Sequence, residues 1–137
     1  MKLKNGMGKQ GGFTLTELLV VIVIIGVLAA LTLPRFLNVT TRAKATEAKL
    51  MLKQIYNLQK AHYLENDVYA TTLEAIGFEQ EKLKTEGGTA RYQITLKSGD
   101  TMGFIATATS VIDFDKDGTF NVWSINHNNE LKQEVPD

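Results

Sequence analysis

The chain has 137 residues, of which 44% are hydrophobic and only two are proline, a composition that fits one folded domain of ordinary size. Its 15 basic and 15 acidic residues cancel, so the charge balance gives no electrostatic case for a nucleic-acid-binding protein. Because cysteine is absent, neither a disulfide framework nor a thiolate metal site can form.

The first twelve residues form a basic segment, with Lys2, Lys4 and Lys9 and no acid. When these three are taken from the 15 basic residues, 12 face 15 acidic ones, and the remainder has a net charge of about −3. Cations ahead of an apolar run retain that end of a chain on the cytoplasmic side of a membrane. The C-terminal part is therefore expected outside.

An apolar run follows, in which the residues from Leu18 to Leu31 carry no charge and no side-chain amide. With its flanks the run reaches about 21 residues, long enough for a helix to span a hydrocarbon layer of ~30 Å. Three interpretations fit this pattern: a secretory signal cleaved near Ala29 and Ala30, a plain membrane anchor, and a leader cleaved ahead of the run.

The junction between the two segments separates these interpretations. It reads Gly11-Gly12-Phe13-Thr14-Leu15-Thr16-Glu17, a glycine pair followed by one acid inside the apolar segment. A carboxylate in hydrocarbon costs about 3 kcal/mol unless it is paired, so Glu17 predicts a contact with a cation. Cleavage before Phe13 would create an ammonium four residues from Glu17, on the same helix face.

This junction resembles that of the type IV pilins and type II secretion pseudopilins, and the resemblance covers nearly the first half of the chain. In that family a prepilin peptidase cuts after a glycine, methylates the new amine, usually of phenylalanine, and needs a glutamate at the fifth mature position. The resemblance implies cleavage between Gly12 and Phe13 with N-methylation of Phe13. It implies assembly roles for Phe13, Glu17, Gly26 and Pro34, the last two bracketing a stretch of helix able to melt on assembly.

Three segments are therefore expected: a prepilin leader over residues 1–12, a hydrophobic transmembrane and assembly helix over 13–37, and a globular domain over 38–137. The resemblance implies as partners further copies or other pilins and pseudopilins, the prepilin peptidase, an inner-membrane assembly platform and, before assembly, membrane lipid. It also implies a single pass through the bacterial inner membrane with the C-terminus outward, then a periplasmic or extracellular filament.

Beyond Pro34 the pattern becomes amphipathic, which predicts one helix from about residue 13 to about residue 65. Apolar residues recur at spacings of three and four, at Ala48, Met51, Leu52, Ile55, Leu58 and Ala61. Pro34 need not end the helix, because proline kinks are tolerated in membrane helices. A short second helix is expected next, with Thr71 or Thr72 as its N-cap and Gly77 as its end.

Alternating apolar residues predict three strands, over residues 91–97, 103–111 and 120–126, with turns at 97–100 and 115–118. The expected fold class is therefore α+β: a long N-terminal helix, hydrophobic in its first half, packed by its second half on a small antiparallel sheet. Trp123 is expected in the core or on a face of that sheet.

Asp113, Asp115 and Asp117 precede Gly118 in a D-x-D-x-D-G pattern, the opening half of an oxygen-ligand calcium loop. An EF-hand is disfavoured because its twelfth position holds Ser124 rather than glutamate. Two interpretations stay open: a strand-connecting calcium site with these three carboxylates as ligands, and a hairpin turn capped by aspartate side chains. Major pseudopilins bind calcium in their C-terminal region, but their flanking sequence matches too weakly to transfer ligands. No other cofactor is expected.

No catalytic constellation is visible, because His62 and His127 are isolated and neither HExxH nor a serine elbow occurs, so an enzyme is not expected. The expected function is a structural subunit of a type IV pilus or of a secretion pseudopilus. The alternative is a single-pass, membrane-anchored calcium- or glycan-binding domain that does not polymerise. Type IV pilins often carry a C-terminal disulfide, which this chain lacks; that leans toward a pseudopilin or a cysteine-free pilin without deciding between them.

Overall fold

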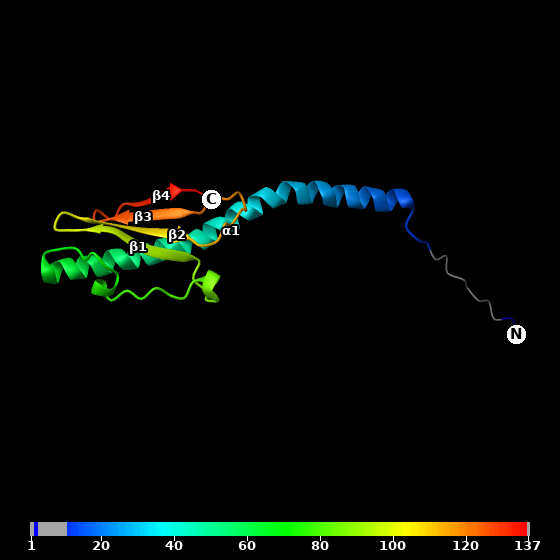
Figure 1. Ribbon diagram of the computed structural model, residues 1–137. Helices are drawn as coiled ribbons and strands as arrows, with labels where there is room; N and C mark the ends of the chain where they lie inside the picture. Colours follow the sequence, from blue (N-terminus) through cyan, green and yellow to red (C-terminus); the bar gives the residue numbers. More distant parts are fainter. Residues whose placement is uncertain (1, 3–10, 137) are drawn as a thin grey trace. The chain divides into compact units, whose positions relative to one another are not determined.

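The computed structural model describes residues 2 and 11–136, apart from the side chains of residues 33–38. The predicted leader over residues 1–12 therefore lies outside the described residues, except for Lys2, Gly11 and Gly12. The chain divides into two compact units, Met1–Phe36 and Leu37–Asp137, and helix α1 (Leu15–Asn66) supplies residues to both (Figure 1).

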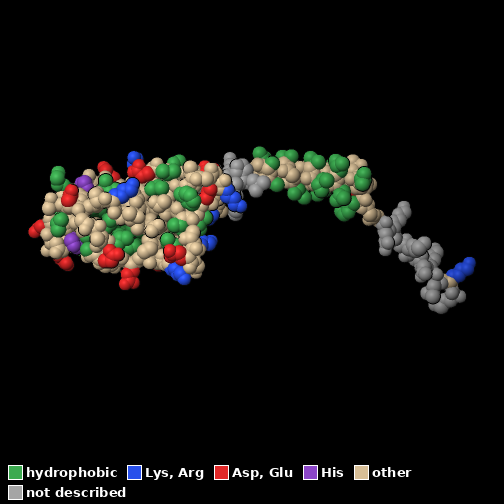
Figure 2. Space-filling view, viewed as in Figure 1, with side chains coloured by type: hydrophobic (Ala, Val, Ile, Leu, Met, Phe, Trp, Pro, Cys, Tyr) green, Lys and Arg blue, Asp and Glu red, His purple; other side chains and the backbone are tan. Residues whose placement is uncertain are grey.

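The predicted long helix is confirmed as α1, whose backbone passes through Pro34 without a break. In the first unit the described apolar side chains of α1 are exposed, and Figure 2 shows hydrophobic side chains along this part of the helix. A helix that is apolar all round has no polar face to turn to water. Within the described residues of this unit these side chains have no core, so another apolar environment must cover them.

The second unit contains a four-stranded antiparallel sheet, formed by β1 (Tyr92–Gly99), β2 (Phe104–Ser110), β3 (Val122–Asn126) and β4 (Leu131–Val135). The strands lie in sequence order, so the sheet is a simple meander. The second half of α1 runs along one face of this sheet (Figure 1). The α+β fold expected from the sequence is thereby confirmed.

The number of strands differs from the expected three, because β4 was missed. Its sequence is Leu131-Lys132-Gln133-Glu134-Val135, in which three polar residues separate the apolar ends and no alternation is visible. β4 is an edge strand with its middle residues exposed, so it needs no apolar face. The first turn also lies later than expected, at Asp100–Gly103, where the Asp100 carboxylate accepts hydrogen bonds from the backbone N–H groups of Met102 and Gly103.

The core lies between α1 and the sheet. Small side chains meet at its centre, where Ala48 of α1 and Ala106 and Ala108 of β2 are all fully buried. Larger buried side chains surround them: Leu52, Ile55, Tyr92, Ile94, Phe104 and Ile125. Trp123 packs against the edge of this cluster, as expected. Ala61, predicted on the same helix face, is exposed near the end of α1.

The short second helix is a single 3-10 turn, η1 (Glu74–Ile76), and another turn, η2 (Lys84–Glu86), follows in the same loop. The hydroxyl of Thr72 accepts a hydrogen bond from the N–H of Ala75, and Gly77 ends the turn with a φ of 69°. Gly77 is the expected stop, whereas the N-cap residue is Leu73 and not Thr71 or Thr72. The segment is too short to close an α-helical turn of its own, so the i→i+3 pattern replaces it.

Two buried or half-buried amides tie the long loop to the rest of the fold. Gln59, fully buried in α1, donates to the carbonyl of Ala70 at 2.9 Å and accepts from the N–H of Ala70 at 2.8 Å. Gln80 contacts β1 in the same way: its side chain accepts from the N–H of Ile94 and donates to the carbonyl of Tyr92. Both amides substitute for backbone partners that an irregular loop lacks.

The Gln59 contact generates a stability prediction for the soluble fragment that begins at residue 38. Gln59→Ala leaves both backbone groups of Ala70 buried without a partner, at about 1–3 kcal/mol for each group. Urea unfolding should show a loss of at least about 2 kcal/mol. Asn57→Ala, an exposed amide two residues earlier on α1, is the matched control and should change the free energy of unfolding by less than about 0.5 kcal/mol. Equal stability of the two variants would contradict the assigned contact.

Candidate functional site

The junction ahead of α1 places the predicted processing residues in an open position. Gly11 and Gly12 are exposed and lie outside regular structure, and Phe13 is 89% exposed. α1 begins two residues later, at Leu15. A peptidase that needs an extended substrate therefore meets no secondary structure at the bond between Gly12 and Phe13.

A capping box closes the N-terminus of α1. The N–H of Thr14 donates to Oε2 of Glu17 at 2.8 Å, and the N–H of Glu17 donates to the hydroxyl of Thr14 at 3.2 Å. This reciprocal pair satisfies two of the helix-terminal N–H groups and places a carboxylate at the positive end of the helix dipole. The sequence reasoning assigned Glu17 to the amine of Phe13 alone and missed Thr14, although the T-x-x-E spacing was the available signal.

The capping box leaves Glu17 with unused capacity. Its Oε2 is engaged within the chain, and no hydrogen bond to Oε1 occurs among the described residues. A carboxylate accepts several hydrogen bonds, so the same side chain can cap its own helix and still meet a cation from elsewhere.

The remaining residues singled out for assembly, Gly26 and Pro34, lie within α1 and away from the junction. Gly26 has open space around it, whereas the side chain of Pro34 lies outside the described residues. Thr32 is the one polar side chain between them; its hydroxyl bonds to the carbonyls of Leu28 and Ala29. By length and composition, Leu15–Thr32 is long and apolar enough to cross a membrane.

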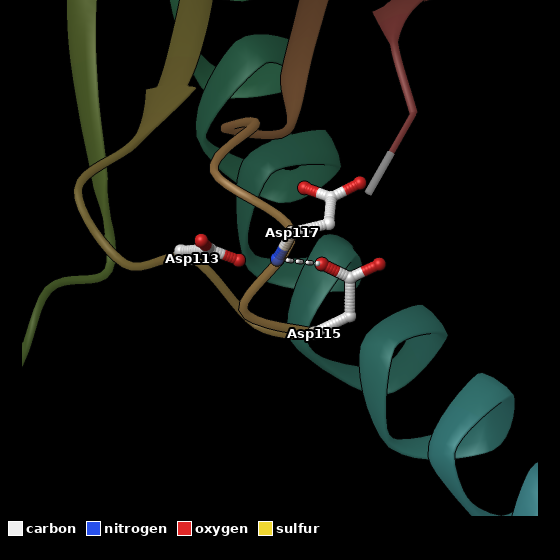
Figure 3. Close-up of side chains that lie close together, drawn as sticks. All are labelled: Asp113, Asp115 and Asp117. Carbon is white, nitrogen blue, oxygen red and sulfur yellow. Dashed lines mark hydrogen bonds between the residues drawn. The ribbon is translucent and has the colours of Figure 1, made fainter.

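The three aspartates of the candidate calcium loop converge between β2 and β3 (Figure 3). A carboxylate oxygen of each of Asp113, Asp115 and Asp117 lies within 4.8 Å of those of the other two. Each aspartate also caps the loop backbone: Asp113 accepts from the N–H groups of Lys116 and Gly118, and Asp115 from that of Asp117. The loop is thus an aspartate-capped turn with its carboxylates already gathered.

This donor set fits a hard divalent cation, because free oxygens remain after the caps are made. The second oxygens of Asp115 and Asp117 accept no hydrogen bond among the described residues. Asp117 accepts from both the hydroxyl and the N–H of Thr119, and these bonds lower the pKa of its carboxyl. Ser124, at the twelfth loop position, lies on β3 and donates to Glu134, so no EF-hand is present.

The two histidines are half-buried, and they contact a backbone carbonyl and a tyrosine ring. Nδ1 of His62 lies 2.9 Å from the carbonyl of Val68, and the ring of His127 lies 6.3 Å from that of Tyr69. Both contacts pack loops against the end of the globular unit. Both rings are therefore partly covered.

Comparison with known proteins places the junction within a known motif. Residues 7–33 match the prokaryotic N-terminal methylation motif, a range that holds both the predicted processing bond and Glu17. The type IV major pilin protein PilA of Myxococcus xanthus is 37% identical over 100 residues, which cover 73% of this chain and 44% of the relative. The chain thus spans less than half the length of that relative.

Two further relatives come from Pseudomonas aeruginosa. A fimbrial protein is 31% identical over 107 residues, 74% of this chain and 70% of the relative. The type II secretion system core protein G is 40% identical over 68 residues, 50% of this chain and 48% of the relative. Since the match to the fimbrial protein extends over more than two thirds of both chains, and the methylation motif falls on the junction described above, the chain belongs to the family of type IV pilins and type II secretion pseudopilins.

Proposed function

We propose that the chain is a structural filament subunit that a prepilin peptidase cleaves between Gly12 and Phe13 and methylates on the new Phe13 amine. The subunit then polymerises through the first half of α1 with further copies or with other pilins. The observation that carries this proposal is the junction itself. An exposed Gly-Phe bond is followed at once by a capped helix that is apolar over a membrane-spanning length and contains one acid, Glu17. The role is structural rather than enzymatic.

Before assembly the subunit is anchored in the bacterial inner membrane through the first half of α1. The lysines of the leader keep its N-terminus in the cytoplasm, so the globular unit faces the periplasm. An inner-membrane assembly platform then extracts the subunit from lipid into a periplasmic or extracellular filament. The exposed apolar side chains of Leu15–Thr32 support both stages, because lipid and a bundle of neighbouring helices each bury them.

Within the filament, Glu17 pairs with the Phe13 amine of a neighbouring subunit. The capping box supports this assignment, since Oε2 is held by Thr14 while Oε1 stays available. The pair neutralises an acid that is expensive in an apolar bundle and sets the register between otherwise featureless helices. Gly26 and Pro34 bracket the segment of α1 that stretches on assembly, because proline removes one helical hydrogen bond and glycine weakens the helix nearby.

The family contains both pili and secretion pseudopili, and the relatives come from both groups. The clustered carboxylates favour a second activity, calcium binding by Asp113, Asp115 and Asp117. The function that competes with the filament subunit is a membrane-anchored calcium-binding domain that never polymerises. Filament yield separates the two.

Processing gives the first test. The mature subunit isolated from membranes or sheared filaments should begin at N-methyl-Phe13, because the peptidase acts at the boundary between the polar leader and the apolar helix. N-terminal peptide mass analysis measures both the start and the added methyl group. A start at or beyond Ala30 would indicate an ordinary signal peptide and end the proposal.

Assembly is tested by two substitutions that separate the charge of Glu17 from its cap. Glu17→Gln retains the capping box, since glutamine also serves at that position, but removes the charge. Filaments should be lost, because breaking a buried ion pair costs about 3–5 kcal/mol at every subunit contact. Thr14→Ala retains the charge and weakens the cap by about 1 kcal/mol, so it should lower the yield far less. The yield of sheared filaments is measured beside an immunoblot for mature subunit in the membrane; wild-type yield from Glu17→Gln would refute the pairing.

Calcium binding is tested on the soluble fragment from residue 38. A saturating calcium concentration, about 100 times Kd, should stabilise the folded state by about 2.7 kcal/mol and raise Tm. The double substitution Asp115→Ala and Asp117→Ala should abolish this shift, whereas Asp67→Ala, an exposed acid outside the loop, should retain it. If calcium leaves the Tm of the unmodified fragment unchanged, the loop is an aspartate-capped turn alone.

A further inference from the structure

Two grooves border the exposed face of α1 in the globular unit, and their charges are opposite. The basic groove is lined by Thr41, Arg42, Ala45, Thr46, Lys49, Asn121, Trp123, Gln133 and Pro136. The acidic groove is lined by Glu47, Leu50, Met51, Gln54, Phe78, Glu79, Glu81, Thr89, Ala90 and Arg91. Because the two sets of α1 residues point to different sides of the helix, the grooves lie on opposite flanks of it.

The basic groove carries two cations. Arg42 and Lys49 are seven residues apart, so both lie on one side of α1. Among the residues that the structure describes, no carboxylate lines this groove and neither cation forms a salt bridge. The ammonium of Lys49 lies 4.5 Å from the centre of the Trp123 ring, a contact that positions the charge without neutralising it.

Two buried donors underlie the same groove. Asn121 is fully buried; its Oδ1 accepts from the hydroxyl of Tyr92 at 3.1 Å, but its Nδ2 has no hydrogen-bond partner among the described residues. Nε1 of Trp123 is also buried and has no partner in the part of the chain that the structure describes. Buried N–H groups are nearly always satisfied in folded proteins. Because both donors lie beneath the surface, the groups that this groove offers to a partner are the cations Arg42 and Lys49, which suit a partner that brings carboxylates.

The acidic groove carries carboxylates that have no cationic partner among the described residues. Arg91 is occupied by Glu47, which accepts from both its guanidinium, at 3.1 Å, and its backbone N–H, at 2.8 Å. Glu79 and Glu81 are exposed and have no cationic partner among the described residues. Gln80 between them is turned to β1 by its two hydrogen bonds, which fixes the backbone that carries both acids.

We propose that the basic groove of one subunit docks on the acidic groove of the next, with Arg42 and Lys49 facing Glu79 and Glu81 of a second copy of this chain. The inference rests on the proposed function and specifies the contact between neighbouring globular units in the filament. Such a contact joins two different surfaces of identical chains, so one subunit of a docked pair keeps a free acidic groove and the other keeps a free basic groove. Heterologous contacts of this type build open helical polymers rather than closed dimers.

The positions of the grooves also set the offset between neighbours. The basic groove uses α1 residues 41–49 and the acidic groove uses α1 residues 47–54, so their midpoints differ by between five and six residues. With parallel helix axes, docking one groove on the other displaces the neighbour by about 8 Å along α1, at 1.5 Å per residue. Each added subunit thus advances the polymer by a fraction of its own length.

Charge reversal tests the contact in the full chain, expressed in cells. The variant Arg42→Glu with Lys49→Glu and the variant Glu79→Lys with Glu81→Lys should each lower the yield of sheared filaments at least tenfold. The chain that carries all four substitutions restores opposite charges across the contact and should recover most of the wild-type yield. As a matched control, Glu74→Lys with Glu86→Lys reverses exposed acids outside both grooves and should leave the yield within twofold. Full yield from both double variants, or no recovery in the fourfold variant, would overturn the proposal.

Cross-linking gives an independent test that leaves every charge in place. The chain has no cysteine, so Thr46→Cys in the basic groove and Thr89→Cys in the acidic groove introduce the only thiols. Filaments of the double variant, treated with a short bis-maleimide, should give a ladder of covalent oligomers, whereas each single variant should stay monomeric. Intact filaments without a ladder would refute this contact while leaving the filament function untouched; absence of filaments from the unmodified chain would instead refute the filament function.

Discussion

The contact between the second half of α1 and the sheet organises the globular unit. Alanines at its centre, Ala48 on the helix and Ala106 and Ala108 on β2, keep both surfaces shallow, and larger side chains close the contact around them. Packing at this density leaves little room for a shift of α1 against the strands. This one contact positions the charged residues on the flanks of α1 and the loop of residues 113–118. It also positions the loop that Gln59 holds at Ala70.

The first half of α1 obeys a different constraint, since its described apolar side chains are exposed. Family membership and the exposed apolar surface together indicate a membrane-anchored precursor and a filament, the two settings in which such a helix is buried. The capping box is useful in the membrane and in the filament. It satisfies N–H groups that would otherwise be exposed at the start of the helix, and it holds the carboxylate of Glu17 at the end that a neighbour can reach.

Local chemistry made the long helix and the alternating strands predictable from the sequence. Helical spacing on α1 and alternation in β2 each follow from one element burying one face, and the Asp pattern follows from its own short-range caps. The missed features depend on partners far along the chain. β4 is a polar edge strand recognised only through its pairing with β3, and Gln59 reads as an ordinary helix-surface amide until the loop at Ala70 folds onto it. The capping box is the exception, because its spacing was visible and was overlooked.

Gln80 protects one edge of the sheet against pairing with strands of other copies of this chain. Its side chain occupies backbone groups on the open edge of β1, and at the other edge β4 presents Lys132 and Glu134, which pair with each other at 3.2 Å. A free sheet edge invites another strand, and charges or blocked backbone groups are the usual protection against such pairing. With both edges protected, crowded subunits have little tendency to fuse their sheets into an irreversible aggregate.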